Sequence, residues 1–140
     1  MLKKFNYRIK VYYEDTDAGG VVYYANYLKF IERARSEALL DIGLSNLKIK
    51  KDFGALIIVK SCSINFIKSS YLEDQLKISS FITSFNKASF MMDQVVSRDD
   101  DIIVTAKVHL VFVNEKGKPV KVPDIIFNNF KPYFCDSIKL

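Results

Sequence analysis

The alternation of apolar and polar residues predicts a chain of five strands and one long helix. Residues 5–13 alternate, with Phe5, Tyr7 and Ile9 on one side, as expected for a strand with one buried face. Apolar residues then recur at helical spacing from 26 to about 42, and Gly43 follows as a stop signal. Four more strands are predicted at residues 55–66, 76–85, 88–97 and 102–113, with a polar connection at 44–54 and a terminal helical turn at 124–134.

This order of elements favours an α+β fold with a curved sheet. The joins between the last three predicted strands are short, which indicates antiparallel neighbours. The helix carries Ala34 and Ala38 on its apolar face, and such small residues allow it to lie close against a sheet. One helix cannot cover both faces of a five-stranded sheet, so we expect the sheet to curl around the helix and the remaining apolar surface to bind a partner.

The composition is that of a globular chain with one domain, which we place at residues 1–140. Hydrophobic residues make up 49% and charged residues 26%, and these proportions exclude a disordered chain. The formal net charge of +5 is spread along the chain as single Lys and Arg residues, apart from a small cluster at 48–51. A nucleic-acid surface would need this charge on one face, so we expect no nucleic-acid partner.

The sequence also lacks the common signals of export and of cofactor binding. The N-terminal residues have no apolar core of a signal peptide, and no apolar run is long enough to span a bilayer. Cys62 and Cys135 lie far apart without metal-ligand spacing, so we expect two reduced thiols and a cytoplasmic protein. Without a Cys/His cluster or a GxGxxG motif, we expect neither a metal nor a dinucleotide cofactor.

The residues that can carry chemistry are concentrated between positions 12 and 39. Three acids, Glu14, Asp15 and Asp17, precede a pair of glycines at 19–20, which can adopt positive φ and fold the chain sharply. Asn26, a favourable N-cap residue, then starts the predicted helix. The start of a helix offers unpaired N–H groups and partial positive charge. A carboxylate beside it could therefore attack, or activate water, where a carbonyl oxygen is polarised.

The spacing of acids, glycine and an Asn-Tyr pair in this stretch is specific. The residues concerned are Asp15, Thr16, Asp17, Gly20, Val22, Asn26 and Tyr27, followed by Glu32, Arg33, Ala34 and Arg35. With them the chain resembles the acyl-CoA thioesterases of the hotdog fold, most nearly the branch associated with the bacterial Tol-Pal cluster and next the 4-hydroxybenzoyl-CoA thioesterases. The resemblance continues more weakly to about Pro123. It implies a curled five-stranded sheet around one helix and hydrolysis of acyl-CoA by a homo-oligomer, most simply a tetramer of two dimers.

The resemblance also implies roles for individual residues. In the family the acid immediately before Ala-Gly or Gly-Gly performs the chemistry, which here is Asp17, as nucleophile or as general base. The backbone N–H at Tyr24 polarises the thioester oxygen. The Tol-Pal-associated branch commonly has His at this position, whereas the hydroxybenzoyl-CoA branch has Tyr. Glu14 and Asp15 then become structural residues that hydrogen-bond the backbone of the turn.

Substrate contacts are expected at Gly20, Val21, Asn26, Lys60 and Lys87. The two lysines and the basic surface suit an anionic group such as coenzyme A, and the Lys87 join corresponds to a basic segment of the hydroxybenzoyl-CoA branch. Each residue also has a plainer interpretation, since exposed lysines are usually only solvated and Asn26 can serve as a helix cap alone.

Other functions remain open on the sequence alone. The basic surface would also suit acyl carrier protein, an acidic partner from which the enzyme could remove acyl groups. A non-catalytic acyl-binding or scaffolding protein, linked to envelope maintenance, is favoured by the Tyr at position 24, whereas Asp17 argues for an enzyme. The acyl group itself cannot be read from the sequence, because aromatic lining fits both aryl and aliphatic chains.

Overall fold

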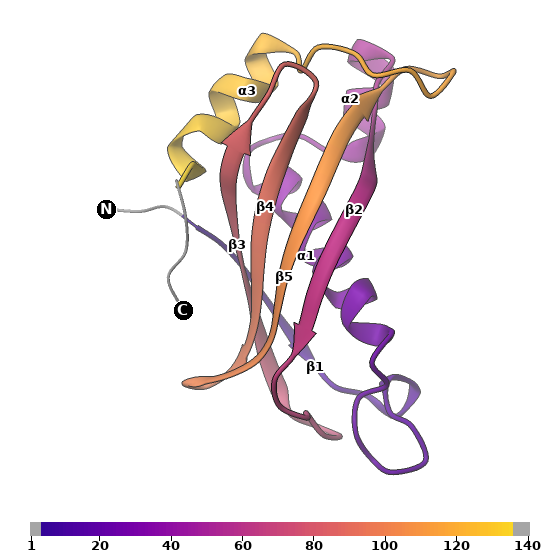
Figure 1. Ribbon diagram of the computed structural model, residues 1–140, viewed down its shortest axis with the longest axis vertical. Helices are drawn as coiled ribbons and strands as arrows, with labels where there is room; N and C mark the ends of the chain where they lie inside the picture. The colour runs from indigo at the N-terminus through magenta and orange to yellow at the C-terminus, as the bar shows by residue number, and fades with distance from the viewer. Residues whose placement is uncertain (1–3, 136–140) are drawn as a thin grey trace.

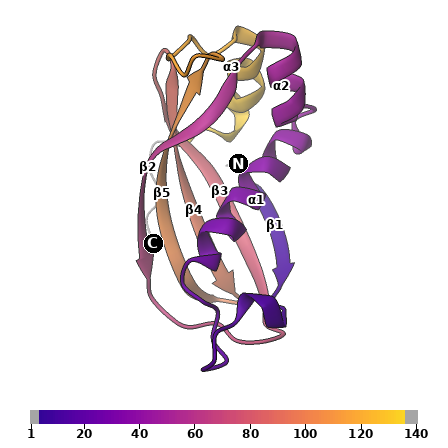
Figure 2. The same cartoon turned by 90° about the vertical axis from the view of Figure 1, so that its right-hand side faces the viewer.

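The computed structural model describes residues 4–135 and contains a five-stranded antiparallel sheet that curves around the long helix α1 (Figures 1 and 2). The strand order is β1-β3-β4-β5-β2, so β1 and β2 are the two edges. The predicted α+β class and the curled antiparallel sheet are therefore confirmed, and residues 1–3 and 136–140 of the predicted domain lie outside the described residues. The elements are β1 (Phe5–Lys10), a 3₁₀ turn (Tyr13–Asp15), α1 (Asn26–Asp41), α2 (Asn46–Phe53), β2 (Leu56–Phe66), β3 (Gln75–Phe85), β4 (Ser89–Arg98), β5 (Asp101–Val113), α3 (Asp124–Phe130) and a second 3₁₀ turn (Lys131–Tyr133).

Helix α1 covers the inner face of the sheet, with its close contacts on β1 and β3 (Figure 2). Ala34 and Ala38 are each only 2% exposed, in agreement with the small residues expected where a helix approaches a sheet. Because α1 lies toward β1 and β3, it leaves the inner face of β2 less covered. In the part of the chain that the structure describes, no helix has the length and hydrophobicity needed to cross a membrane.

A buried polar cluster lies under the middle of α1. Gln94 is fully buried, and its Nε2 donates to the carbonyl of Ile31 (2.9 Å) and to Oγ of Ser80 (3.0 Å). Arg35 Nη1 in turn donates to Gln94 Oε1 (3.0 Å). Sequence analysis missed this cluster, although Gln94 interrupts an otherwise apolar alternation in β4, which is the signal that such a residue leaves.

The first strand is shorter than predicted. It ends at Lys10, opposite Gln75 at the start of β3, and the N–H of Val11 donates to the carbonyl of Asp74 (2.9 Å). The chain then enters the 3₁₀ turn, and Tyr13 is 81% exposed. The prediction of a strand to residue 13 was wrong because β3, the partner that supplies hydrogen bonds, begins at Gln75.

Helix α2 was not predicted, and the expected polar connection at residues 44–54 was wrong. Ser45 caps this helix by accepting the N–H of Lys48 on its hydroxyl (3.0 Å). Gly54 ends it in the left-handed region (φ +62°), with its N–H donating to Lys50. Ile49 is the one buried residue of the helix, so the segment carries almost no apolar periodicity. The two cap residues, Ser45 and Gly54, were the only sequence signal for this helix.

Strand β2 is an exposed, irregular edge. Four of its apolar side chains are between 38% and 49% exposed, namely Leu56, Ile58, Val59 and Phe66. Its pairing with β5 shifts between Val59 and Ser61, so Lys60 occupies a β-bulge. This edge accounts for much of the apolar surface that was expected to remain uncovered.

Tyr27 fastens α1 to the segment before β3 and gives a pH-dependent prediction. Its hydroxyl lies 2.5 Å from Oγ of Ser70, and both residues are buried. Burial raises the pKa of Tyr27 above its ordinary value of 10.0. The neutral form is therefore favoured by folding, so its contribution to stability is complete below about pH 10 and is lost as the pH rises further.

We expect Tyr27→Phe to lower the free energy of unfolding by about 1 kcal/mol at neutral pH and to show a smaller fall in Tm above about pH 10 than the parent. Thermal unfolding over a pH series checks this, and parallel curves would contradict it.

Candidate functional site

The acidic segment forms a tight loop in front of α1. The N–H of Asp17 donates to the carbonyl of Val21 (2.9 Å), and the N–H of Gly20 donates back to the carbonyl of Asp17 (3.0 Å). Thr16 and Val22 form an antiparallel bridge at the base of the loop. Of the two glycines only Gly20 adopts a positive φ, at +81°. The expectation of positive φ in this turn is thus met at Gly20.

Asp17 stands exposed at this loop. Its Oδ1 accepts the N–H of Gly19 at 2.8 Å, which fixes the direction of the carboxylate. A Cβ at Gly19 would lie 3.2 Å from the same oxygen, so glycine keeps that approach open. Among the described residues no other hydrogen bond reaches the Asp17 carboxylate. One oxygen is therefore anchored, and the other is available to a ligand.

Asp15 has the structural role predicted for it. It is 5% exposed, and its Oδ2 accepts the N–H of Tyr12 (2.9 Å) while its Oδ1 accepts Nδ2 of Asn26 (2.8 Å). Its carbonyl also accepts the N–H of Tyr23 (2.9 Å). Asp15 thus connects the acidic loop directly to the first turn of α1. Glu14, the third acid, is exposed.

Asn26 does not cap α1, which corrects the prediction. The N-cap position belongs to Ala25, whose backbone is already helical (φ −66°, ψ −22°), whereas a side-chain cap requires an extended residue there. A turn in which the N–H of Asn26 donates to Tyr23 (2.8 Å) leads the chain into the helix. The Asn26 side chain is used instead to hold Asp15.

The turn that leads into α1 presents free backbone donors. Within the described residues, the N–H groups of Tyr24 and Ala25 have no acceptor, as is usual for the positive end of a helix. Aromatic rings surround this point, since Tyr24 stacks edge-on against Phe66 (5.9 Å between ring centres) and lies beside Tyr23 (5.0 Å). These rings are 47–61% exposed, so the start of the helix is open to solvent in the single chain.

The structure brings together one part of the predicted site and separates another. The loop residues Gly20 and Val21 adjoin Asp17, and Asn26 links the loop to the helix start that carries Tyr24. Lys60 lies further along β2, at the bulge in the middle of the strand.

The join between β3 and β4, which contains Lys87, lies at the opposite end of the sheet from the acidic loop (Figure 1). It belongs to the join that enters β4 at Ser89, opposite Val111, whereas Phe66, which touches Tyr24, pairs with Val104 at the other end of β5. Lys87 therefore does not adjoin Asp17 of the same chain. His109 sits half-buried on β5 between Ser61 and Met91.

Sequence reasoning missed three contributors to the site. They are the buried Ser70, which accepts the N–H of Val22 on its carbonyl (2.8 Å), the aromatic neighbour Phe66, and the Asp15–Asn26 hydrogen bond. Each depends on segments that meet only in the folded chain. Of these residues, only Asp15 and Asn26 were candidates from the sequence.

Proteins similar to this chain in sequence and in fold are named as thioesterases. Residues 11–130 match the family model described as the thioesterase-like superfamily. The chain is 34% identical over 120 residues to the acyl-CoA thioesterase YbgC of Haemophilus influenzae, covering 85% of this chain and 88% of that protein. It is 36% identical over 129 residues to the acyl-CoA thioester hydrolase YbgC of Escherichia coli, covering 91% and 96%. A crystal structure of a probable thioesterase from Bartonella henselae superposes with a TM-score of 0.84 at 35% identity, over 86% of this chain and 100% of that one.

Proposed function

We propose that this chain, which belongs to the thioesterase-like superfamily, hydrolyses the thioester bond of an acyl-CoA to a free acid and coenzyme A. The observation that carries the proposal is the Asp15–Asn26 hydrogen bond, which fastens the loop with the exposed Asp17 to the start of α1, beside the free N–H groups of Tyr24 and Ala25. The similar proteins from Haemophilus influenzae and Escherichia coli are named as acyl-CoA thioester hydrolases. The proposed reaction uses no cofactor, and coenzyme A enters only as part of the substrate.

The proposed chemistry divides between one side chain and one backbone group. The N–H of Tyr24 donates to the thioester oxygen and stabilises the negative charge that develops on it. Asp17 either attacks the carbonyl carbon, forming an anhydride that water then cleaves, or takes a proton from the attacking water. In both routes the C–S bond breaks, the CoA thiolate leaves and takes up a proton, and the acyl group ends as a carboxylic acid.

We assign the remaining contacts to the two ends of the substrate. Gly20, Val21 and Asn26 line the approach to the thioester, and Lys60 and Lys87 meet the phosphates of CoA. Because Lys87 lies at the opposite end of the sheet from its own Asp17, it would serve the Asp17 of another protomer. Contacts of this exposed kind contribute on the order of 1 kcal/mol or less each, so they set affinity and leave the chemical step unaltered.

We also propose a homo-oligomer, formed by antiparallel pairing of two β2 edges and assembled further into a tetramer. The support is the exposed apolar edge of β2, which a two-fold related copy of the same strand can complete. The partner's β2 would then border the Asp17 site. Light scattering at micromolar concentration is expected to give at least a dimer, and a monomeric mass would refute the arrangement.

Acyl carrier protein is a second candidate substrate carrier, supported by the net charge of +5. We further propose that the chain forms one domain, works in the cytoplasm and is associated with the Tol-Pal cluster, in line with its resemblance to that branch.

Measured thiol release tests the function directly. The panel comprises short, long and aromatic acyl-CoAs together with the matching acyl carrier protein thioesters. Hydrolysis of acyl-CoA is expected. Hydrolysis of the carrier-protein thioesters alone would select the second candidate, and no hydrolysis of either class would leave only an acyl-binding role.

A further inference from the structure

The connection between β2 and β3 packs against the loop that carries Asp17. The carbonyl of Ser70 accepts the N–H of Val22 at 2.8 Å, and Val21 forms an antiparallel bridge with Tyr71. The carbonyl of Val21 in turn accepts the N–H of Asp17 at 2.9 Å. The backbone of Asp17 is therefore tied by hydrogen bonds to a segment that lies far away in the sequence.

Arg98, the last residue of β4, holds this connection from the other side. Its Nη1 donates to the carbonyl of Ser69 (3.2 Å) and to Oδ2 of Asp74 (2.8 Å). The same carboxylate oxygen accepts the N–H of Tyr71 (2.8 Å), and the guanidinium lies 5.9 Å from the centre of the Tyr71 ring. The side chains of Arg98 and Asp74 are only 24% and 23% exposed. One guanidinium thus fixes both ends of the stretch that meets the acidic loop.

The backbone beside this ion pair adopts an unusual conformation. Glu73, which precedes Asp74, has a φ of +68°, and Asp99, which follows Arg98, has a φ of +52°. Among the described residues, these are the two non-glycine positions in the left-handed region. Such conformations are unfavourable for residues with a side chain and persist where the surrounding contacts enforce them, often near functional sites. The Arg98–Asp74 pair supplies contacts of this kind.

We propose that Arg98 is a positioning residue for the loop that carries Asp17, an inference that rests on the proposed thioesterase function. Its hydrogen bonds fix the connection between β2 and β3, which holds Val21 and Val22 through the backbone. In the described part of the chain, no hydrogen bond or ion pair joins Arg98 to the acidic loop itself, so its effect passes through the connection. A shift of a reacting group by about 1 Å can lower a rate on the order of 10²-fold.

Arg98→Gln tests this role, with Lys68→Gln as the matched control. Lys68 lies on the same connection and pairs with Asp101 at 2.9 Å, and Nη2 of Arg98 lies 3.8 Å from the same carboxylate. Both substitutions remove one positive charge from this end of the sheet, but only Arg98→Gln removes the hydrogen bonds to Ser69 and Asp74. We expect Arg98→Gln to lower kcat about tenfold or more with KM within about twofold of the parent, and Lys68→Gln to keep both values.

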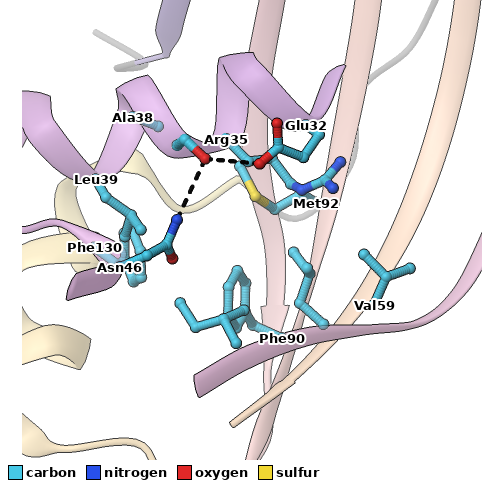
Figure 3. A pocket seen from close by; sticks show the side chains of 12 residues that line it. Glu32, Arg35, Ala38, Leu39, Asn46, Val59, Phe90, Met92 and Phe130 are labelled. Atoms are coloured by element: carbon cyan, nitrogen blue, oxygen red, sulfur yellow. Dashed lines mark hydrogen bonds between the residues drawn. The ribbon is translucent and has the colours of Figure 1, made fainter. Parts of the chain in front are cut away.

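The two substitutions leave the interior of the molecule unchanged. Of the described residues, neither Arg98 nor Lys68 lines the cavity of about 160 Å³ between α1 and the sheet (Figure 3). An effect of Arg98→Gln on turnover would therefore not come from a change in this space.

Kinetics well below Tm separate positioning from stability. A merely structural role of Arg98 would lower Tm and leave the kcat of the folded enzyme unaltered. A double-mutant cycle with Asp74→Asn gives a second readout, because two side chains that act as one unit lose no more kcat together than the larger single loss. Parent-like kcat in Arg98→Gln, equal losses in Arg98→Gln and Lys68→Gln, or additive losses in the cycle would overturn the proposal.

Hydrogen exchange provides a readout that needs no turnover. The backbone amides of Asp17 and Val22 are expected to exchange about tenfold faster or more in Arg98→Gln, and at the parent's rate in Lys68→Gln. Unchanged exchange in Arg98→Gln would also overturn the positioning role. A parent that hydrolyses no acyl-CoA would overturn the proposed function separately, and the exchange rates would still decide whether Arg98 fixes the loop.

Discussion

Asp17→Asn is expected to lower kcat by about 10²–10⁴-fold, the range that general acid–base catalysis contributes. Asparagine keeps the shape of the side chain, and its amide oxygen can still accept the N–H of Gly19. It lacks the charge needed to attack a carbonyl or to take a proton from water. Substrate should therefore still bind, with KM equal to or below that of the parent, and Tm should change little because the side chain is exposed.

Glu14→Gln is the control for this experiment. Glu14 is an exposed acid in the same segment, so the change removes the same charge without touching the loop hydrogen bonds. It should retain kcat within about twofold, as most exposed substitutions have small effects. Steady-state kinetics on the best acyl-CoA of the panel checks both variants. Parent-like turnover in Asp17→Asn would end the assignment of chemistry to this residue.

Asp15→Asn is expected to lower stability strongly. The carboxylate is buried and accepts hydrogen bonds from two donors, the N–H of Tyr12 and the amide of Asn26. An asparagine would turn its own NH₂ group toward one of them, leaving buried donors unpaired at a cost of about 2–3 kcal/mol. We expect Tm to fall by about 6–12 °C for a domain of this size. Activity should fall as well, because the loop that carries Asp17 is no longer fixed to α1.

The pair of variants separates chemistry from scaffolding. Asp17→Asn should combine a parent-like Tm with lost turnover, whereas Asp15→Asn should lose both, and cooling should restore part of its activity. Differential scanning calorimetry and initial rates at two temperatures provide the comparison. A parent-like Tm in Asp15→Asn would mean that its hydrogen bonds contribute little to the fold.

The strands and α1 could be predicted because their patterns are long. In β5, for example, Val104, Ala106 and Val108 alternate with Thr105 and Lys107 over a run of thirteen residues. Helix α2 could not be found in this way, because one buried residue in eight gives no period, although Ser45 and Gly54 mark its two ends. The spacing of apolar residues indicates which side chains are buried. It cannot reveal a short helix that buries only one side chain and is held mainly by its caps.

The candidate site was predictable in its residues and only partly in its arrangement. The acid, the glycine and the helix start are adjacent in sequence, so their proximity follows from the chain itself. The role of Asn26 depends on Asp15, eleven residues earlier, whose carboxylate the 3₁₀ turn at residues 13–15 brings beside it. The position of Lys87, at the end of the sheet away from Asp17, follows from the pairing of β4 with β5 and cannot be read from the spacing of residues in the sequence.

The exposed edge of β2 also bears on the risk of aggregation. A lone protomer offers unpaired backbone groups flanked by apolar side chains, a template onto which other extended chains can add. Lys60 interrupts that edge with a charge at a bulge, the combination by which natural sheets resist uncontrolled growth. Neutralising Lys60 would remove this charge and leave the edge more open to the addition of other extended chains. We expect the lysine in the middle of the strand to limit such addition while the edge is unpaired.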